Sequence, residues 1–247
     1  TAPAEAFWRS WSCTRRSTGR ITPFRLWKAT TQRNQSGSKR KENEALIITA
    51  AEKIFADMGY AGATMQQIAD AAGLPKANLH YYFPTKEILY RNVIDKIFNL
   101  WLEAADIFDA AEGPKDGLSS YIDAKLESSR HFPNGSKVWA NEVIQGAPII
   151  QDYLESKLTA WTHSKAEIIE MWIAKGLMDP INPKTLLYFI WSATQHYADF
   201  QHQIRTLNNN SDLTEAQWSE VKEDIKKLVL KGLGLEHVSE CPTISDE

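Results

Sequence analysis

The 247-residue sequence predicts an all-α protein, with an N-terminal three-helix domain that contains a helix-turn-helix and a larger C-terminal helical domain. Three observations predict this fold class. Apolar side chains recur every three or four residues over most of the chain, which is the period of helices packed on a core. Capping residues and glycine or proline stops bound these stretches. The sequence shows neither strand-like alternation nor an internal repeat.

Two short helices joined by a tight turn are predicted in the first third of the chain. Thr64 can cap the first helix, and Gln67 stands where the partner in a capping box belongs. Gly73 can adopt the positive φ that ends this helix. Pro75 then starts a second helix, which ends in an aromatic run. This arrangement is a helix-turn-helix, whose second helix has the right shape for the major groove of DNA.

The second short helix, over 76–82, carries both core and outward-facing side chains. Leu79 and Phe83 are expected in the core, whereas Asn, Lys and Tyr side chains face outward and can bind bases or phosphates. The alternative is an ordinary helical hairpin without DNA. The residues expected to contact DNA are Thr64, Gln66, Lys76, Ala77, Asn78, His80, Tyr81, Tyr82 and Lys86.

Seven further helices are predicted from periodicity and stops. Their expected ranges are 41–58, 85–111, 114–131, 136–145, 149–175, 183–207 and 214–232. We expect the helix over 85–111 to connect the helix-turn-helix to the rest of the chain. The expected domains are a helix-turn-helix DNA-binding domain at 41–87, a ligand-binding and dimerisation domain at 88–233 and a frayed tail at 234–247.

The first forty residues differ from the rest in charge. Residues 1–41 hold ten Lys and Arg and one acid, giving +9, whereas the remainder carries −12 within a net charge of −3. A basic arm of this kind suits phosphate contact. Its mixture of Trp, Arg and Ser also fits an expression remnant or an over-extended start. We therefore expect a basic arm, disordered or foreign to the protein, at 1–40.

The segment 191–200, W-S-A-T-Q-H-Y-A-D-F, places several polar groups among aromatic side chains on one helix. Each polar group needs a partner when it is buried, and a small planar polar ligand can supply one. Core packing or a satisfied buried network is the alternative. The candidate ligand-binding residues are Trp191, Gln195, Trp101, Lys125, Trp139, Glu142 and His196.

Other functions find little support in the sequence. No apolar run is long enough to span a membrane, and Cys13 and Cys241 match neither a disulfide framework nor a zinc site, which suggests a cytoplasmic protein. His196, Asp199 and His202 are spaced so that the outer two point apart and do not share a metal. Catalytic and nucleotide-binding motifs are missing. We expect no metal, no cofactor and no enzymatic activity.

The stretch 73–90, G-L-P-K-A-N-L-H-Y-Y-F-P-T-K-E-I-L-Y, resembles the signature of TetR-type transcriptional regulators. This resemblance implies a double-stranded DNA operator, a small-molecule effector and a homodimer through the last two long helices. Such a dimer places two recognition helices about 34–36 Å apart. Pro75 and His80 depart from the residues most usual in the family, which leaves the operator sequence open.

Within that family, the chain resembles the pyrimidine-utilisation regulators. The resemblance rests on 191–200 together with S-S-R-H-F-P at 128–133 and G-A-P-I-I at 146–150. It implies a repressor whose effector is uracil or thymine. Two alternatives stay open: a TetR-type regulator of another small molecule, such as a drug or lipid, and an interaction module that has lost DNA binding.

Overall fold

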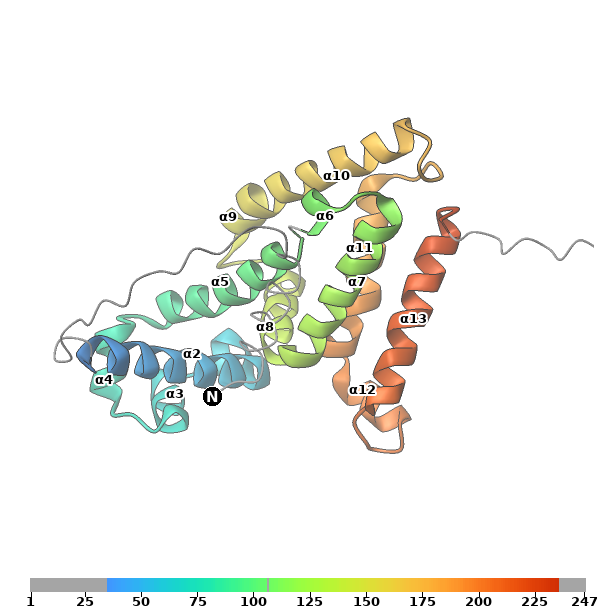
Figure 1. The fold of residues 1–247 in the computed structure, drawn as a ribbon. Coiled ribbons are helices and arrows are strands. Elements are labelled where there is room, and N and C mark those ends of the chain that lie inside the picture. The colour runs from blue at the N-terminus through green and yellow to red at the C-terminus, as the bar shows by residue number, and fades with distance from the viewer. Residues whose placement is uncertain (1–34, 106, 236–247) are drawn as a thin grey trace, which may run out of the picture. The chain divides into compact units, whose positions relative to one another are not determined.

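The computed structural model describes residues 35–105 and 107–235, whose regular structure is entirely helical (Figure 1). The predicted fold class is confirmed. By its contacts the chain divides into two compact units, residues 1–45 and 46–247. Residues 1–34 of the predicted arm and 236–247 of the predicted tail lie outside the described residues. A domain boundary near residue 87 stays a prediction.

The predicted helix-turn-helix is present. Helix α3 (Met65–Ala72) begins at the Thr64 capping box and ends at Gly73, whose φ of 67° is left-handed. Helix α4 (Lys76–Tyr82) follows Pro75. Helix α2 (Gln35–Gly62) precedes them and is interrupted by the non-helical Gly59 (φ 68°, ψ 174°). The helix expected to end near residue 58 therefore continues past a kink at Gly59. Met58, next to this kink, is 47% exposed and does not lie in the predicted apolar face.

The chain after the helix-turn-helix contains more helices than predicted. Three expected helices are each replaced by several elements: 85–111, 149–175 and 183–207. The elements are α5 (Lys86–Ala105), α6 (Ile107–Ala110), α7 (Pro114–His131), α8 (Pro133–Ile144), α9 (Gln151–Tyr153), the π-helical turn η1 (Leu154–Leu158), α10 (Thr159–Ala174), α11 (Pro183–Asp199), α12 (Gln201–Leu207) and α13 (Glu215–Gly232).

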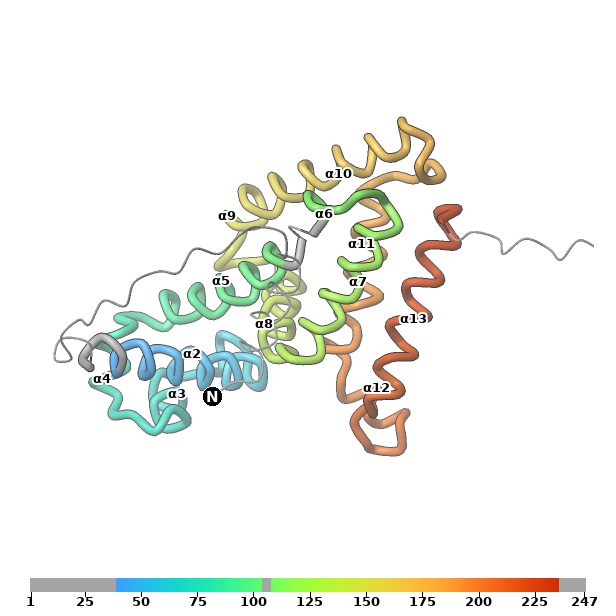
Figure 2. Tube along the Cα trace, viewed as in Figure 1, coloured from blue at the N-terminus to red at the C-terminus, as the bar shows by residue number. Residues whose placement is uncertain are grey.

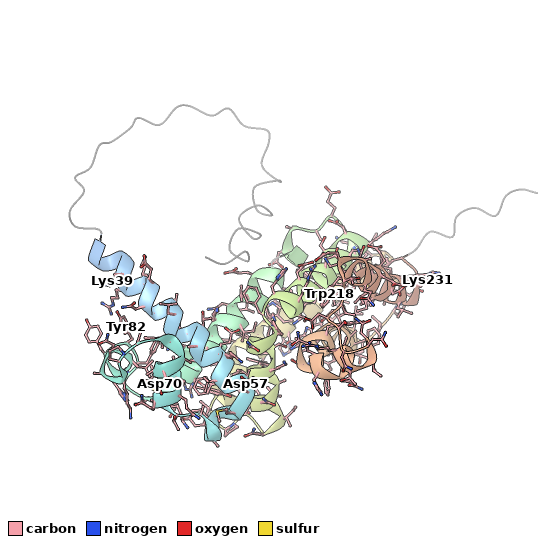
Figure 3. The ribbon with its side chains drawn as sticks, turned by 90° about the horizontal axis from the view of Figure 1, so that it is seen from below. Lys39, Asp57, Asp70, Tyr82, Trp218 and Lys231 are labelled. Carbon is pink, nitrogen blue, oxygen red and sulfur yellow. The ribbon has the colours of Figure 1, made fainter. Side chains whose placement is uncertain are left out.

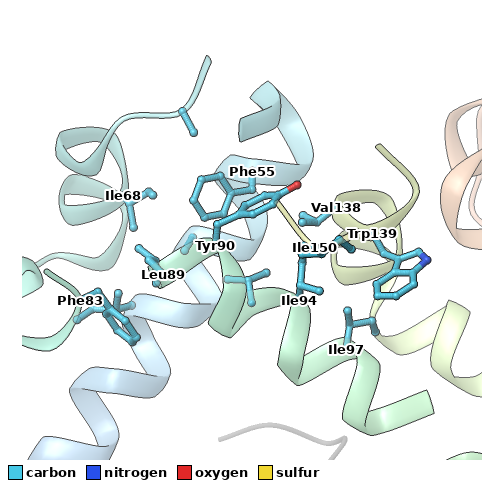
Figure 4. Close-up of a cluster of buried hydrophobic side chains, with 14 of the residues drawn as sticks. Phe55, Ile68, Phe83, Leu89, Tyr90, Ile94, Ile97, Val138, Trp139 and Ile150 are labelled. Carbon is cyan, nitrogen blue, oxygen red and sulfur yellow. The ribbon is translucent and has the colours of Figure 1, made fainter. Parts of the chain in front are cut away.

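One hydrophobic core contains the helix-turn-helix, α5, α8 and the residues that follow α8 (Figure 4). Leu79 of α4 and Phe83 after it are buried there, as predicted. Phe55 meets the ring of Tyr90 edge-on, with centroids 4.8 Å apart. Helix α5 thus shares its apolar face between the helix-turn-helix and α8.

A second core lies among the later helices, where α7 packs against both α11 and α13 (Figure 2). Most apolar residues predicted on the last two long helices belong to it, including Leu187, Ile190 and Val229. Phe200 and Leu228 are exceptions and are exposed. Tyr188 and Phe189 of α11 are exposed as well. An unburied apolar surface therefore exists on α11 and α13, but it involves fewer of the predicted residues than expected.

Candidate functional site

Helix α4 presents most of its side chains to solvent. Lys76, Ala77, Asn78 and His80 are exposed, and Tyr81 is 72% exposed. Leu79 anchors the helix from its opposite side. Tyr82, the last residue of α4, is labelled in Figure 3. Leu79 is the buried residue of α4, and it fixes this short helix to the core. The outer face of α4 is left available to a partner.

Several predicted DNA-contacting side chains also make local bonds. The Thr64 hydroxyl takes part in the α3 capping box with Gln67. The Gln66 amide donates to Asp70 at 2.8 Å, and His80 Nδ1 lies 3.2 Å from the carbonyl oxygen of Pro84. These bonds hold the side chains in place on an exposed surface. Their contact with DNA stays a prediction.

Lys86 has a structural role that the sequence did not indicate. Its ammonium donates to the carbonyl oxygens of Tyr60 (2.7 Å) and Ala63 (3.0 Å) and lies 4.3 Å from the centre of the Tyr60 ring. It therefore caps the carbonyl groups at the end of α2. Only one ammonium hydrogen is left for a phosphate, so that contact stays a prediction.

A cavity of about 60 Å³ lies among α5, α7, α8, α10 and α11. Five of the seven predicted ligand-binding residues line it together, from four of these helices. They are Trp101, Lys125, Trp139, Trp191 and Gln195. Phe98, Leu102, Tyr121, Leu158 and Trp161 complete the wall, which is more aromatic than the sequence indicated.

Some polar side chains of this cavity already form hydrogen bonds with protein groups, and others do not. The Trp191 indole N–H donates to the Tyr121 hydroxyl at 2.8 Å, so Trp191 offers its ring and not its N–H to a ligand. Burial raises the pKa of Tyr121, which keeps this hydroxyl protonated. Among the described residues, no partner hydrogen-bonds the Gln195 amide. Gln195 therefore retains both its donor and its acceptor for a ligand.

Lys125 provides the charge in the cavity wall. It is 2% exposed, and its Nζ lies 4.1 Å from the centre of the Trp101 ring. Burial lowers the pKa of Lys125 to about 7, and the Asp199 carboxylate opposes this shift. The rings of Trp101 and Trp139 meet edge-on with centroids 5.4 Å apart. The ammonium therefore lies in a largely aromatic environment.

Two residues predicted to bind ligand lie outside the cavity. The Glu142 carboxylate is buried, but it accepts from the Tyr90 hydroxyl (3.0 Å) and from the backbone N–H of Ile149 (2.7 Å). Both of its oxygens are thus engaged by protein. His196 points away from the cavity and stacks on Phe200, with centroids 4.8 Å apart. His196 directly follows Gln195 in α11, so its side chain projects about 100° around the helix from the face that Gln195 shares with Trp191.

Sequence reasoning missed Tyr121 and Trp161. The Trp161 indole N–H is enclosed and has no hydrogen-bond partner within the described part of the chain. Its ring centre lies 5.8 Å from that of Trp191. Both missed residues are single aromatics on otherwise ordinary helices, a pattern that core packing explains equally well. Only their position opposite 191–200 reveals them.

Across residues 35–105 and 107–235, no three His, Cys, Asp or Glu side chains gather so that they could hold a metal ion. None of the helices in those ranges combines the length and apolarity that crossing a bilayer requires.

Comparison with known proteins identifies the family. The family model for bacterial regulatory proteins of the tetR family matches residues 47–93, and that for the C-terminal region of YcdC-like proteins matches 94–236. This chain belongs to the TetR family. It is a DNA-binding transcriptional regulator with a helix-turn-helix, and not an enzyme.

Individual relatives agree with this assignment. The HTH-type transcriptional regulator RutR of Escherichia coli K12 is 34% identical over 206 residues, covering 83% of this chain and 96% of that protein. The solved structure of the ketosteroid transcriptional regulator KstR2 of Mycobacterium tuberculosis matches with a TM-score of 0.59 and 21% identity, covering 77% of this chain and 94% of that one. AibR, solved with isovaleryl coenzyme A and operator DNA, matches with a TM-score of 0.62 and 16% identity, covering 75% and 97%. The two structural matches show the fold alone.

Proposed function

We propose that this regulator is a repressor that binds its operator in the ligand-free state and is released by a pyrimidine base such as uracil or thymine. The observation that carries the proposal is the cavity of about 60 Å³ lined by Trp191, Gln195 and Lys125. This volume is several times the ~10–15 Å³ that a cavity needs to hold a single water, so it suits a small ligand.

The chemistry of the wall matches a pyrimidine-dione. The Trp191 ring offers a stacking face, and the Gln195 amide offers a donor and an acceptor to an imide edge. Lys125 offers a donor to a ring carbonyl. The resemblance of 191–200, 128–133 and 146–150 to pyrimidine-utilisation regulators implies the same ligand class.

DNA binding is proposed to use the exposed face of α4. Asn78 and Lys76 have side chains able to read bases, and Tyr81 can reach phosphate. A homodimer through α11 and α13 would bring two such helices to successive turns of the operator. The exposed Tyr188, Phe189 and Leu228 supply apolar surface for that contact.

The ligand is proposed to act through α5. Phe98, Trp101 and Leu102 of α5 line the cavity, while Tyr90 near its start packs against Phe55 in the core of the helix-turn-helix. A ligand that moves the end of α5 therefore acts on the helix that also supports α4. It must bind the operator-free state more tightly, because equal affinity for both states shifts nothing.

The alternative hypothesis within the family is a regulator that responds to a drug or lipid. Sites for drug-sized ligands occupy ~300–1,000 Å³, well above the cavity found here. Calorimetry with uracil, thymine and a lipophilic cation such as tetraphenylphosphonium separates the two. We expect saturable binding of a pyrimidine and none of the cation. Absence of heat with both pyrimidines would refute the proposed effector.

A mobility-shift assay tests the DNA half of the proposal. The protein should retard one short near-palindromic duplex much more strongly than a random duplex of equal length, and uracil should release it. Equal retardation of both duplexes at several salt concentrations would instead favour an interaction module without specific DNA binding.

A further inference from the structure

Lys125 differs from the other strongly buried lysine of the described chain in its surroundings. Lys165 is also almost fully buried, but its ammonium lies 2.6 Å from the Asp109 carboxylate. Lys125 instead faces the ring of Trp101. Within the described residues, no carboxylate comes within the 4.0 Å of an ion pair with Lys125. No described residue therefore gives this buried ammonium a direct counter-charge.

The charged groups around Lys125 are mostly engaged elsewhere. Asp199 of α11 is the nearest opposite charge, but its carboxylate accepts a 2.6 Å hydrogen bond from the Ser136 hydroxyl of α8. Lys137 of α8 and His196 of α11 also act on Asp199. On α7 itself, Asp123 and Glu127 pair with Lys226 and Lys222 of α13, and α5 contributes only apolar and aromatic side chains to the cavity.

A buried cation without a partner is unfavourable, and a ligand that supplies negative potential relieves this cost. Because Lys125 lines the cavity, that relief is available to whatever occupies it. A neutral apolar ligand gains nothing from it, and a cationic ligand is repelled. The cavity therefore sorts its ligands by charge as well as by shape.

We propose that Lys125 makes the cavity select acidic pyrimidines: a ring carbonyl next to an acidic ring N–H faces the ammonium, and the more acidic of two pyrimidines of similar shape binds more tightly. The inference rests on the proposed function and specifies the ligand class of the same site. Burial already holds the pKa of Lys125 to about 7, so part of the protein carries a neutral amine near neutral pH. In that form Lys125 Nζ accepts a hydrogen bond from the ring N–H, and this bond is stronger when the N–H is more acidic.

The test compares uracil with 5-fluorouracil, whose ring N–H is more acidic, by calorimetry near pH 7. We expect the wild-type protein to bind 5-fluorouracil at least fivefold more tightly than uracil. Lys125→Met should bring the two affinities within twofold of each other. Direct contacts of the fluorine are present in both proteins, so the change in the affinity ratio reports the charge of Lys125.

Lys137→Met is the matched control, because it removes a lysine that also acts on Asp199 but lies outside the cavity wall. It should keep the wild-type ratio. Lys125→Gln serves as a second variant if Lys125→Met does not melt cooperatively. An unchanged ratio in the Lys125 variant overturns charge selection and leaves pyrimidine sensing intact. Failure of the wild-type protein to bind either base overturns the proposed function itself, and this inference with it.

Discussion

In the candidate effector site, individual side chains have different roles. Trp191 is fixed by its bond to Tyr121, so it presents a ring of set orientation. Across the part of the chain that the structure describes, the Gln195 amide has no hydrogen-bond partner and the Lys125 ammonium has no ion-pair partner. The sequence identified Trp191 and Gln195 because polar groups within an aromatic helix need partners, and it named Lys125 as a candidate for the opposing wall. It also suggested Glu142 and His196, since composition alone does not show which side of a helix faces a cavity.

Gln195→Ala should weaken uracil binding by about 2 kcal/mol, or roughly thirtyfold, because a ligand imide edge loses both hydrogen-bond partners. Calorimetry measures the change. His196→Ala is the matched control, since His196 is the next residue but lies outside the cavity. Normal uracil binding by Gln195→Ala would mean that the ligand sits elsewhere.

Lys125 also predicts a pH dependence of stability in the ligand-free protein. Its pKa is lowered from the ordinary 10.5 to about 7 in the folded state, so the unfolded chain binds more protons between those values. Stability from this group therefore rises with pH between about 7 and 10.5 and is lowest below 7. Lys125→Met should raise the melting temperature at pH 6.5 by several degrees, and by less at pH 9.5. Thermal melts at the two pH values give the comparison, and a lower melting temperature for the variant at pH 6.5 contradicts an unpaired buried charge.

At the scale of the elements, α5 is held by α8 and by the segment that follows it. Tyr90 bonds Glu142, Arg91 bonds Asp152 at 3.0 Å, and the Tyr153 hydroxyl donates to Asp95 at 2.8 Å. This connecting segment continues through η1 to Leu158 at the cavity. A ligand can therefore act on α5 both directly and through these bonds.

Tyr90→Phe should destabilise the protein by about 1–3 kcal/mol, because the buried Glu142 carboxylate loses one of its two hydrogen-bond donors. Tyr81→Phe removes a hydroxyl of the same kind from an exposed ring and should change stability by less than about 0.5 kcal/mol. Denaturant titration of both variants measures the difference. If Tyr90→Phe is as stable as the wild-type protein, the Glu142 carboxylate does not need the hydrogen bond from Tyr90.

The sequence predicted the short elements better than the long ones. The capping box at Thr64 and the stop at Gly73 lie where expected, because each depends on neighbours within four residues. The breaks at η1 and Phe200 were missed. A π-helical turn keeps helical dihedrals and carries no glycine or proline, so tertiary packing and not local sequence places it. The same limit applies to Tyr121 and Trp161.

At the scale of the whole molecule, we propose that operator recognition depends on a second copy of the chain. One α4 has seven residues, and the segment 42–96 carries five basic and seven acidic side chains, so this segment by itself has little electrostatic attraction to DNA. Two copies about one DNA turn apart double the specific contacts and fix the spacing of the half-sites. Family members are typically dimers, and α11 and α13 carry the exposed apolar side chains for such a contact.

Leu228→Glu tests this dependence. Leu228 is 67% exposed on α13, so the change should leave the fold of one chain intact while placing two like charges in a symmetric interface. We expect sedimentation to show a monomer at low micromolar concentration and operator affinity to fall by at least tenfold. Met171→Glu, at an exposed position on α10, should leave both unchanged. If Leu228→Glu remains a dimer that binds operator normally, the interface lies on another face. If it becomes a monomer with undiminished operator affinity, one α4 suffices and the spacing of two recognition helices plays no part in binding.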